Sequence, residues 1–151
     1  MSSISRTSVK QVAEWVRSGQ VPEPVRLIDV RDEDHRGGHV RGSWHLPSDE
    51  VFERMEELVR KTAFGSKERS VDGTQRTVVF YCMHSCMRGP SAAQLYVQCL
   101  RRYAVALNDD ERAAYRPPAV YVMDGGYRAF AKAYARTEPE LFEDLKTSGG
   151  E

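Results

Sequence analysis

The chain has 151 residues, a length that fits one domain around one hydrophobic core. Apolar residues make up 40% of the chain and charged residues 29%, as in soluble globular proteins. The 22 basic and 22 acidic side chains give a formal net charge of zero, which excludes a global attraction to nucleic acid or to an anionic membrane. Any anion site must therefore be built locally, from backbone N–H groups or a placed arginine.

No apolar run approaches the ~20 residues that a membrane helix needs, so we expect no membrane association. Residues 1–10 are polar and lack the apolar stretch of a secretory signal, which favours a cytoplasmic, reducing location. The three cysteines, Cys82, Cys86 and Cys99, are too few for a disulfide framework. No cysteine–histidine grouping has zinc-site spacing, so we expect no metal.

Helical spacing and helix-start signals predict the first set of elements in the chain. Helices are expected over residues 8–18, 49–63, 89–103 and 127–134, with a shorter one over 108–114. Ser8 is the expected N-cap of the first helix, and Pro90 lies early in the first turn of the third.

Three short apolar runs predict strands, at residues 25–30, 77–81 and 119–123. Strands that alternate with helices imply a parallel α/β sheet, with catalytic loops beyond the carboxyl ends of the strands. The remaining segments are expected to connect these elements. They are a charged run at 31–36, an extended segment at 40–47, a polar connection at 65–73 and a disordered tail at 146–151. A second charged run, at 109–112, falls within the short helix expected over 108–114. We expect the charged runs to be solvated surface.

The stretch between the clearest strand and the clearest helix start carries the chemistry. It contains Cys-x5-Arg, from Cys82 to Arg88. A loop at this junction can turn its backbone N–H groups inward, and the following helix adds the positive end of its dipole. Cys82 would lie at the floor of this nest as a stabilised thiolate, and the Arg88 fork would hold two oxygens of a tetrahedral anion. The expected oxyanion-binding residues are Met83, His84, Ser85, Cys86, Met87 and Arg88, with Cys82 and Arg88 catalytic.

Two side chains within this motif, Cys86 and His84, have two interpretations each. Cys86 is either a resolving thiol or a residue that fills space in the loop. His84 could protonate a leaving group, but loop side chains more often point to solvent, which is the interpretation we favour. Cys99 falls among the apolar residues of a helix and is expected to pack in the core.

The loop resembles that of the cell-division-cycle dual-specificity phosphatases and of the related rhodanese-fold arsenate and antimonate reductases, which carry His-Cys-x5-Arg. Two flanking stretches, residues 28–43 and 121–130, are similar to further signatures of that family, so the resemblance spans residues 28–130. It implies a three-layer α/β domain of rhodanese type with a central, mostly parallel sheet, and residues 1–151 are expected to form one catalytic domain.

The resemblance also assigns supporting roles outside the loop. It implies an ion pair of Asp29 and Arg31 beneath the active loop, and a structural role for His39 before a turn. The glycines at 125–126 are expected to form a tight strand-to-helix turn, because they lack nucleotide-loop spacing.

Three positions depart from the family pattern. Tyr81 stands where the family has histidine before the nucleophile, a position that can tune the thiolate. Val30 stands where the cell-cycle phosphatases often carry a second cysteine, so that disulfide is excluded here. Met87 replaces a glutamate, which leaves no obvious general acid in the loop.

Loop length and chain length then favour one activity. The loop has seven residues from Cys82 to Arg88, whereas sulfur-transferring relatives typically have six. The longer loop favours oxyanion chemistry over sulfur transfer. The short chain resembles the stand-alone reductases in size more than the cell-cycle phosphatases, which have a regulatory N-terminal region. We therefore expect reduction of arsenate or antimonate by external thiols such as glutathione or glutaredoxin, together with phosphatase activity on phosphoesters. No bound cofactor is expected. The alternatives are a dedicated dual-specificity phosphatase, a thiosulfate sulfurtransferase that works through a Cys82 persulfide, and a non-catalytic binding module.

Overall fold

The computed structural model describes residues 4–35, 37–64 and 75–145. Its centre is a sheet of five strands in the order β1-β6-β5-β2-β4, and every neighbouring pair in it is parallel. The strands are β1 (Ile4–Thr7), β2 (Val25–Asp29), β4 (Trp44–His45), β5 (Thr77–Tyr81) and β6 (Ala119–Met123). The predicted α/β class with a mostly parallel sheet is confirmed.

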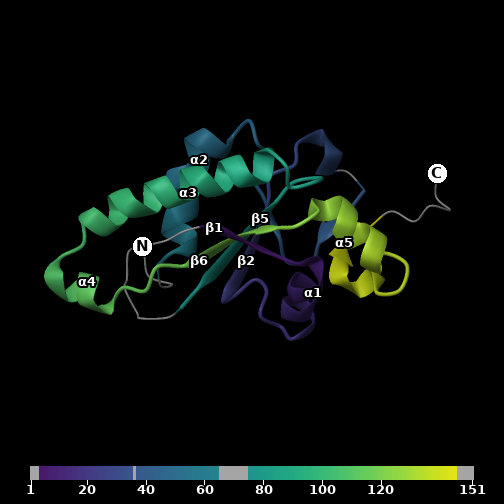
Figure 1. The fold of residues 1–151 in the computed structure, drawn as a ribbon, viewed down its shortest axis with the longest axis horizontal. Helices are drawn as coiled ribbons and strands as arrows, with labels where there is room; N and C mark the ends of the chain where they lie inside the picture. The colour runs from purple at the N-terminus through teal and green to yellow at the C-terminus, as the bar shows by residue number, and fades with distance from the viewer. Residues whose placement is uncertain (1–3, 36, 65–74, 146–151) are drawn as a thin grey trace.

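Helices cover both faces of the sheet, which gives three layers (Figure 1). On one face lie α2 (Val51–Thr62) and α3 (Arg88–Val105), and on the other lie α1 (Val9–Arg17) and α5 (Gly126–Tyr134). The short helix α4 (Asp109–Ala114) follows α3. Ser8 caps α1 as predicted, because its side chain accepts the Gln11 N–H at 3.0 Å.

A second, two-stranded sheet lies beside the first. It pairs β3 (His39–Val40) with β7 (Phe142–Glu143) in antiparallel register. The 3-10 turns η1 (Glu33–His35) and η2 (Pro139–Leu141) precede these two strands. Neither β1 nor β7 was predicted, because both are short and β1 is mostly polar. β1 forms a strand because it pairs with β6 at the edge of the sheet. The predicted connection at 65–73 and the tail at 146–151 lie outside the described residues.

The pleat of β5 sends successive side chains to opposite faces of the sheet. Val78, Phe80 and the following Cys82 pack into the core under α2 and α3. Val79 and Tyr81 pack into the separate core under α1 and α5. The alternation therefore fixes the face on which the Cys82 thiol lies. None of the described helices is long and apolar enough to span a bilayer.

Candidate active site

The loop between β5 and α3 closes around the Cys82 sulfur. The backbone N–H groups of Ser85 and Gly89 donate to Sγ at 3.1 and 3.3 Å. The loop can curl this tightly because Ser85 adopts a left-handed conformation, with φ of 56°. Cys82 is only 3% exposed, and Ser85 is fully buried. Two N–H dipoles thus point at the sulfur.

The prediction of a nest around Cys82 agrees with this geometry, and one donor of the nest was missed. The Gly89 amide belongs to the first turn of α3, one residue beyond the predicted loop. Unsatisfied amides at a helix start are the signal that could have identified it. That the backbone N–H groups of residues 83–88 bind the oxygens of an anion stays a prediction.

The opposite side of the loop is held by α5. The Tyr127 and Arg128 N–H groups, at the start of α5, donate to the carbonyl oxygens of Cys82 and Met83, both at 2.9 Å. Gly126 approaches so closely that a Cβ there would lie 2.5 Å from both oxygens. The glycine pair forms the predicted strand-to-helix turn, with φ values of 75° and 64°. It also makes a contact with the active loop that the sequence interpretation did not include.

Arg88 is the first residue of α3, and its guanidinium group is bound by two carboxylates. Nη1 and Nη2 donate to the two Asp34 oxygens at 3.1 and 2.7 Å, and Nη1 donates to Asp32 at 3.3 Å. The hydrogen bond to Asp34 is the main cause that raises the pKa of Arg88, so this group stays charged. The prediction that the charged run 31–36 is solvated surface was wrong for these two aspartates.

The other predicted loop residues face outward. His84, Cys86 and Met87 are exposed, and Met83 is half-buried. His84 thus points to solvent, as favoured. Cys82, Cys86 and Cys99 are all free thiols, and Cys99 is buried in the core as predicted. The exposed Cys86 thiol lies 3.8 Å from the His84 carbonyl oxygen, so its redox role stays a prediction.

The predicted ion pair beneath the loop is present and completely buried. Arg31 Nη2 lies 2.7 Å from Asp29 Oδ2, and both side chains are 0% exposed. Arg31 also donates to the carbonyl oxygens of Asp34 at 3.0 Å and Gly38 at 2.8 Å. Its guanidinium carbon lies 3.9 Å from the centroid of the Tyr127 ring. The pair therefore fixes the loop after β2 to the core.

Tyr81 has a structural position on the face away from the thiol. Its hydroxyl accepts the Val40 N–H at 3.3 Å and donates to Ser43 Oγ at 3.0 Å. Burial raises the pKa of Tyr81 well above 10, so the phenol is neutral. Val30 is fully buried where the family's second cysteine would lie. His39 contacts Glu143 Oε1 at 3.2 Å, and that same oxygen accepts the Gly42 N–H, in keeping with the predicted turn.

Three imidazole rings stack beside the loop after β2. The ring centroid of His35 lies 3.8 Å from that of His45 and 5.0 Å from that of His39. Burial lowers the pKa of His35 below its ordinary 6.5, although the Asp29 carboxylate opposes this shift. The positive charges that the other two rings and Arg31 can carry lower it further.

We expect the protein to lose stability as the pH falls from 6.5 toward the lower pKa of folded His35. Above 6.5 the ring is neutral in both states; below it the unfolded chain binds the proton more readily, so protonation favours unfolding. Thermal melts from about pH 7.5 to pH 5 would measure this, and His35→Gln should flatten the dependence. The exposed His84→Gln is the control, and an equal slope in all three proteins would contradict the prediction.

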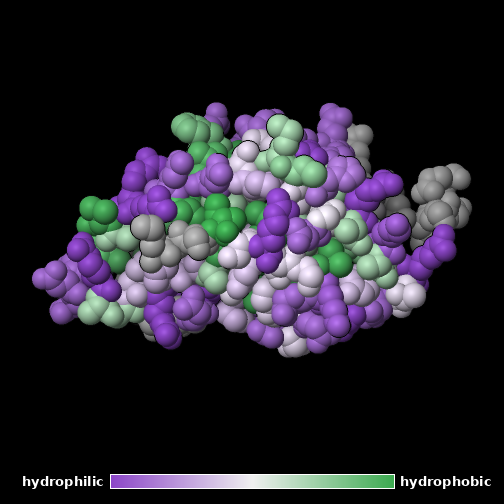
Figure 2. All heavy atoms as spheres, viewed as in Figure 1, coloured by the Kyte–Doolittle hydropathy of each residue, from purple (hydrophilic) through white to green (hydrophobic). Residues whose placement is uncertain are grey.

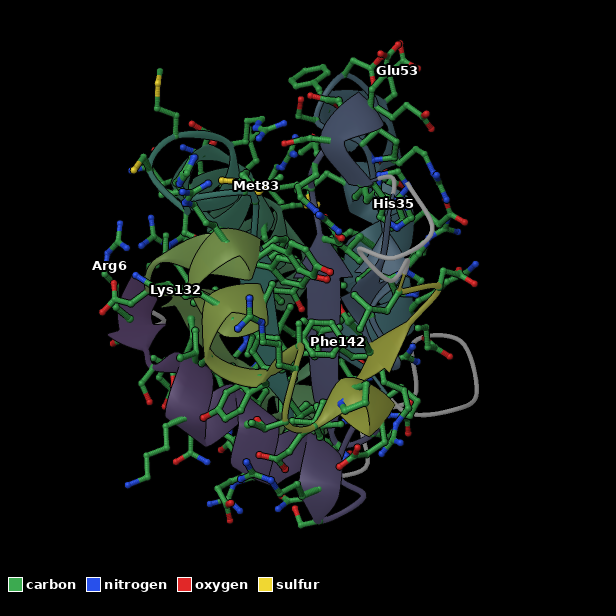
Figure 3. The ribbon with its side chains drawn as sticks, turned by 90° about the vertical axis from the view of Figure 1, so that its right-hand side faces the viewer. Arg6, His35, Glu53, Met83, Lys132 and Phe142 are labelled. Atoms are coloured by element: carbon green, nitrogen blue, oxygen red, sulfur yellow. The ribbon has the colours of Figure 1, made fainter. Side chains whose placement is uncertain are left out.

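Within the described ranges, no three His, Cys, Asp or Glu side chains are grouped in a way that could hold a metal ion. Figure 3 shows Met83, in the active loop, and His35, in η1, on the same end of the molecule. The loops after β5 and β2 meet there because β2 and β5 are neighbours in the sheet.

Five parallel strands with helices on both faces, and a cysteine loop after the central strand, define a protein of rhodanese fold. The chain belongs to the rhodanese-like domain family, whose model matches residues 8–133. This membership confirms the family resemblance predicted from the three motifs.

Relatives of known name fall in two groups. The chain is 28% identical over 144 residues to "Dual specificity phosphatase ibp1" of Schizosaccharomyces pombe, which covers 89% of this chain and 93% of the relative. It is 36% identical over 98 residues to "Arsenate reductase 2.2" of Oryza sativa subsp. japonica, with 64% of this chain and 65% of the relative covered. The As-Sb reductase structure from Leishmania major superposes with a TM-score of 0.72 at 23% identity, over 98% of this chain and 90% of that one. That likeness shows the shared fold.

Proposed function

We propose that residues 1–151 act as one cytoplasmic enzyme domain that reduces arsenate or antimonate with external thiols. The observation that supports this best is the pair of N–H groups on Cys82 Sγ, in the same loop that ends at Arg88. Cys82 is the nucleophile, and the loop amides and Arg88 hold the substrate oxygens. Glutathione or glutaredoxin serves as the reductant, and no bound cofactor is required.

The reaction balances with two external thiols. The Cys82 thiolate displaces one arsenate oxygen, which takes up protons and leaves as water, and an S–As bond forms. An external thiol then attacks the Cys82 sulfur, and the S–As electron pair stays on arsenic, which leaves as arsenite. A second thiol releases Cys82 from the resulting mixed disulfide. Two thiols are oxidised to one disulfide, and arsenic gains two electrons.

Arsenate-dependent oxidation of NADPH, coupled through glutathione, glutaredoxin and glutathione reductase, tests this reaction. Wild type should oxidise NADPH only when arsenate is added, and omission of the enzyme gives the background rate. The coupling enzymes are checked separately with a disulfide substrate. No arsenate-dependent rate with competent reductants would reject the reductase assignment and leave phosphoester hydrolysis as the leading activity. Transfer of sulfur from thiosulfate to cyanide would instead support the sulfurtransferase alternative.

A groove beside Arg88 favours a second activity, hydrolysis of phosphate esters. It has a volume of about 280 Å³ and is lined by Ser48, Val51, Phe52, Met87, Arg88, Ser91, Ala92 and Leu95. Phe52 and Met87 are 80% and 76% exposed, and hydrophobic spheres lie above α2 and near the start of α3 in Figure 2. Arsenate has no organic group to fill an apolar groove, whereas the aryl group of a phosphate ester does.

In this second reaction, Cys82 displaces the ester oxygen from phosphorus and water then hydrolyses the phosphocysteine. An aryl leaving group needs little protonation, which suits a loop with Met87 in place of an acid. The relatives named as dual-specificity phosphatases support this activity.

Phe52→Ala should lower kcat/KM for an aryl phosphate about fivefold, because a contact between the Phe52 ring and the aryl group of the substrate is worth roughly 1 kcal/mol. Arsenate turnover should change less than about twofold, since that anion has no organic group for Phe52 to contact. Val105→Ala, which removes an equally exposed side chain at the far end of α3, is the matched control. Equal losses with both substrates would show that Phe52 does not contact the organic group.

A further inference from the structure

Part of the guanidinium group of Arg88 is hydrogen-bonded to carboxylates, while another edge of it has no acceptor among the described residues. It carries five N–H bonds in a planar fork. Asp34 takes the end of the fork, with one bond from each terminal nitrogen, and Asp32 takes a second bond from Nη1. In the described part of the chain no acceptor is bound to Nε. The Nε–H and the remaining Nη2–H form a parallel pair, which is the geometry that binds two oxygens of an oxyanion.

The two carboxylates are themselves fixed before they contact Arg88. Asp34 Oδ1 accepts the Asp32 N–H at 2.8 Å, and the Asp34 carbonyl oxygen accepts a bond from the buried Arg31. Asp32 accepts the Ser48 N–H at 2.8 Å and the Ser48 hydroxyl at 2.6 Å. A continuous set of hydrogen bonds therefore joins the buried Asp29–Arg31 pair to the guanidinium group of Arg88.

Arg88 gains order from these contacts. Its side chain is 32% exposed, so without partners it would sample several rotamers at a cost of roughly 2 kcal/mol when an anion fixed it. The Gly89 N–H, which follows Arg88 in the chain, donates to Cys82 Sγ at 3.3 Å. The start of α3 therefore lies at the sulfur while the two aspartates hold the guanidinium group of Arg88.

We propose that Asp34, assisted by Asp32, is a positioning residue that presents the Nε–Nη2 edge of Arg88 to the oxyanion on Cys82. Neither aspartate touches the anion in this arrangement. Both act through Arg88, by fixing the rotamer that an anion would otherwise have to select. The inference rests on the proposed oxyanion site and adds the residues that prepare it.

Protection of Cys82 against alkylation tests this without requiring turnover. Iodoacetamide labelling of Cys82, followed by mass spectrometry, is measured against rising arsenate and, separately, phosphate. Half-protection of Asp34→Asn should need about tenfold more anion than half-protection of wild type. This is the effect expected when one well-placed charge-assisted contact is lost. Glu33→Gln is the matched control, since this acid lies between the two aspartates and should leave the protection constant unchanged.

Two further variants separate positioning from folding. Asp34→Glu restores a carboxylate and should recover part of the anion affinity, whereas a loop that had lost its structure would not recover. In an Arg88→Lys background, Asp34→Asn should change the protection constant less than about twofold, because lysine has no fork to orient. A full additive effect in that background would overturn the proposal.

The outcomes distinguish the two levels of the argument. If neither anion protects wild-type Cys82, the proposed oxyanion function fails and the positioning role fails with it. If wild type is protected and Asp34→Asn is protected equally or better, the oxyanion site stands. The aspartates would then only neutralise Arg88, and the positioning proposal would be rejected.

Discussion

Cys82→Ser is expected to lower arsenate-dependent turnover by about 10³-fold or more, to the background of the coupled assay. A serine hydroxyl ionises far less readily than a thiol at neutral pH, so the N–H groups of Ser85 and Gly89 would face a neutral oxygen. Serine also cannot form the disulfide through which the external thiol releases the enzyme. Hydrolysis of an aryl phosphate should fall with it, because both proposed reactions begin at the Cys82 sulfur.

Cys86→Ser is the matched control for this substitution. Cys86 is exposed and belongs to the same loop, so its replacement changes the same atom without touching the nest. Turnover within about twofold of wild type is expected if external thiols resolve the intermediate. A loss in Cys86→Ser comparable to that in Cys82→Ser would assign Cys86 as the resolving thiol. Unchanged turnover in Cys82→Ser would reject the proposed nucleophile.

Gly126→Ala should destabilise the protein by about 3 kcal/mol and distort the active loop. Its positive φ disfavours any side chain, and the added Cβ would lie 2.5 Å from the carbonyl oxygens of Cys82 and Met83. Those oxygens cannot move freely, because each accepts an N–H bond from α5. Urea or thermal denaturation measures the loss of stability, and the rate of Cys82 alkylation reports on the loop.

Gly19→Ala isolates the conformational part of that effect. Gly19 has a φ of 77°, close to that of Gly126, but a Cβ there would meet nothing within 4 Å. We expect a cost of about 1 kcal/mol and an unchanged alkylation rate. Equal destabilisation by the two substitutions would show that the contact with the active loop contributes nothing.

Local sequence predicted the centre of the site because its parts are consecutive in the chain. A strand at 77–81, a seven-residue loop and a helix start place Cys82 and Arg88 without reference to the rest of the molecule. The hydrogen-bond partners of Arg88 could not be predicted from local sequence, because Asp32 and Asp34 follow a different strand, β2. Their charges alone are typical of solvated surface. The parallel neighbours β2 and β5 bring both loops to one edge, and that rule would have pointed to them.

The edges of the fold were harder to predict for a related reason. β1 has only two half-buried positions, Ile4 and Thr7, and β7 has two residues, so neither contains enough apolar pattern to indicate a strand. Their pairing is set by tertiary neighbours: β6 for one and β3 for the other. Whether a short segment with weak strand propensity forms a strand depends on its tertiary neighbours.

The bonds from α5 also determine the direction of two peptide planes. In a trans peptide the carbonyl and the following N–H point to opposite sides. With the Cys82 and Met83 carbonyl oxygens bound by α5, the N–H groups of Met83 and His84 must point away from that helix. The dipoles of the loop are thereby preorganised before any substrate arrives, and little reorganisation energy is needed when negative charge develops beside them. A helix distant in sequence thus sets the electrostatic polarity of the loop between β5 and α3.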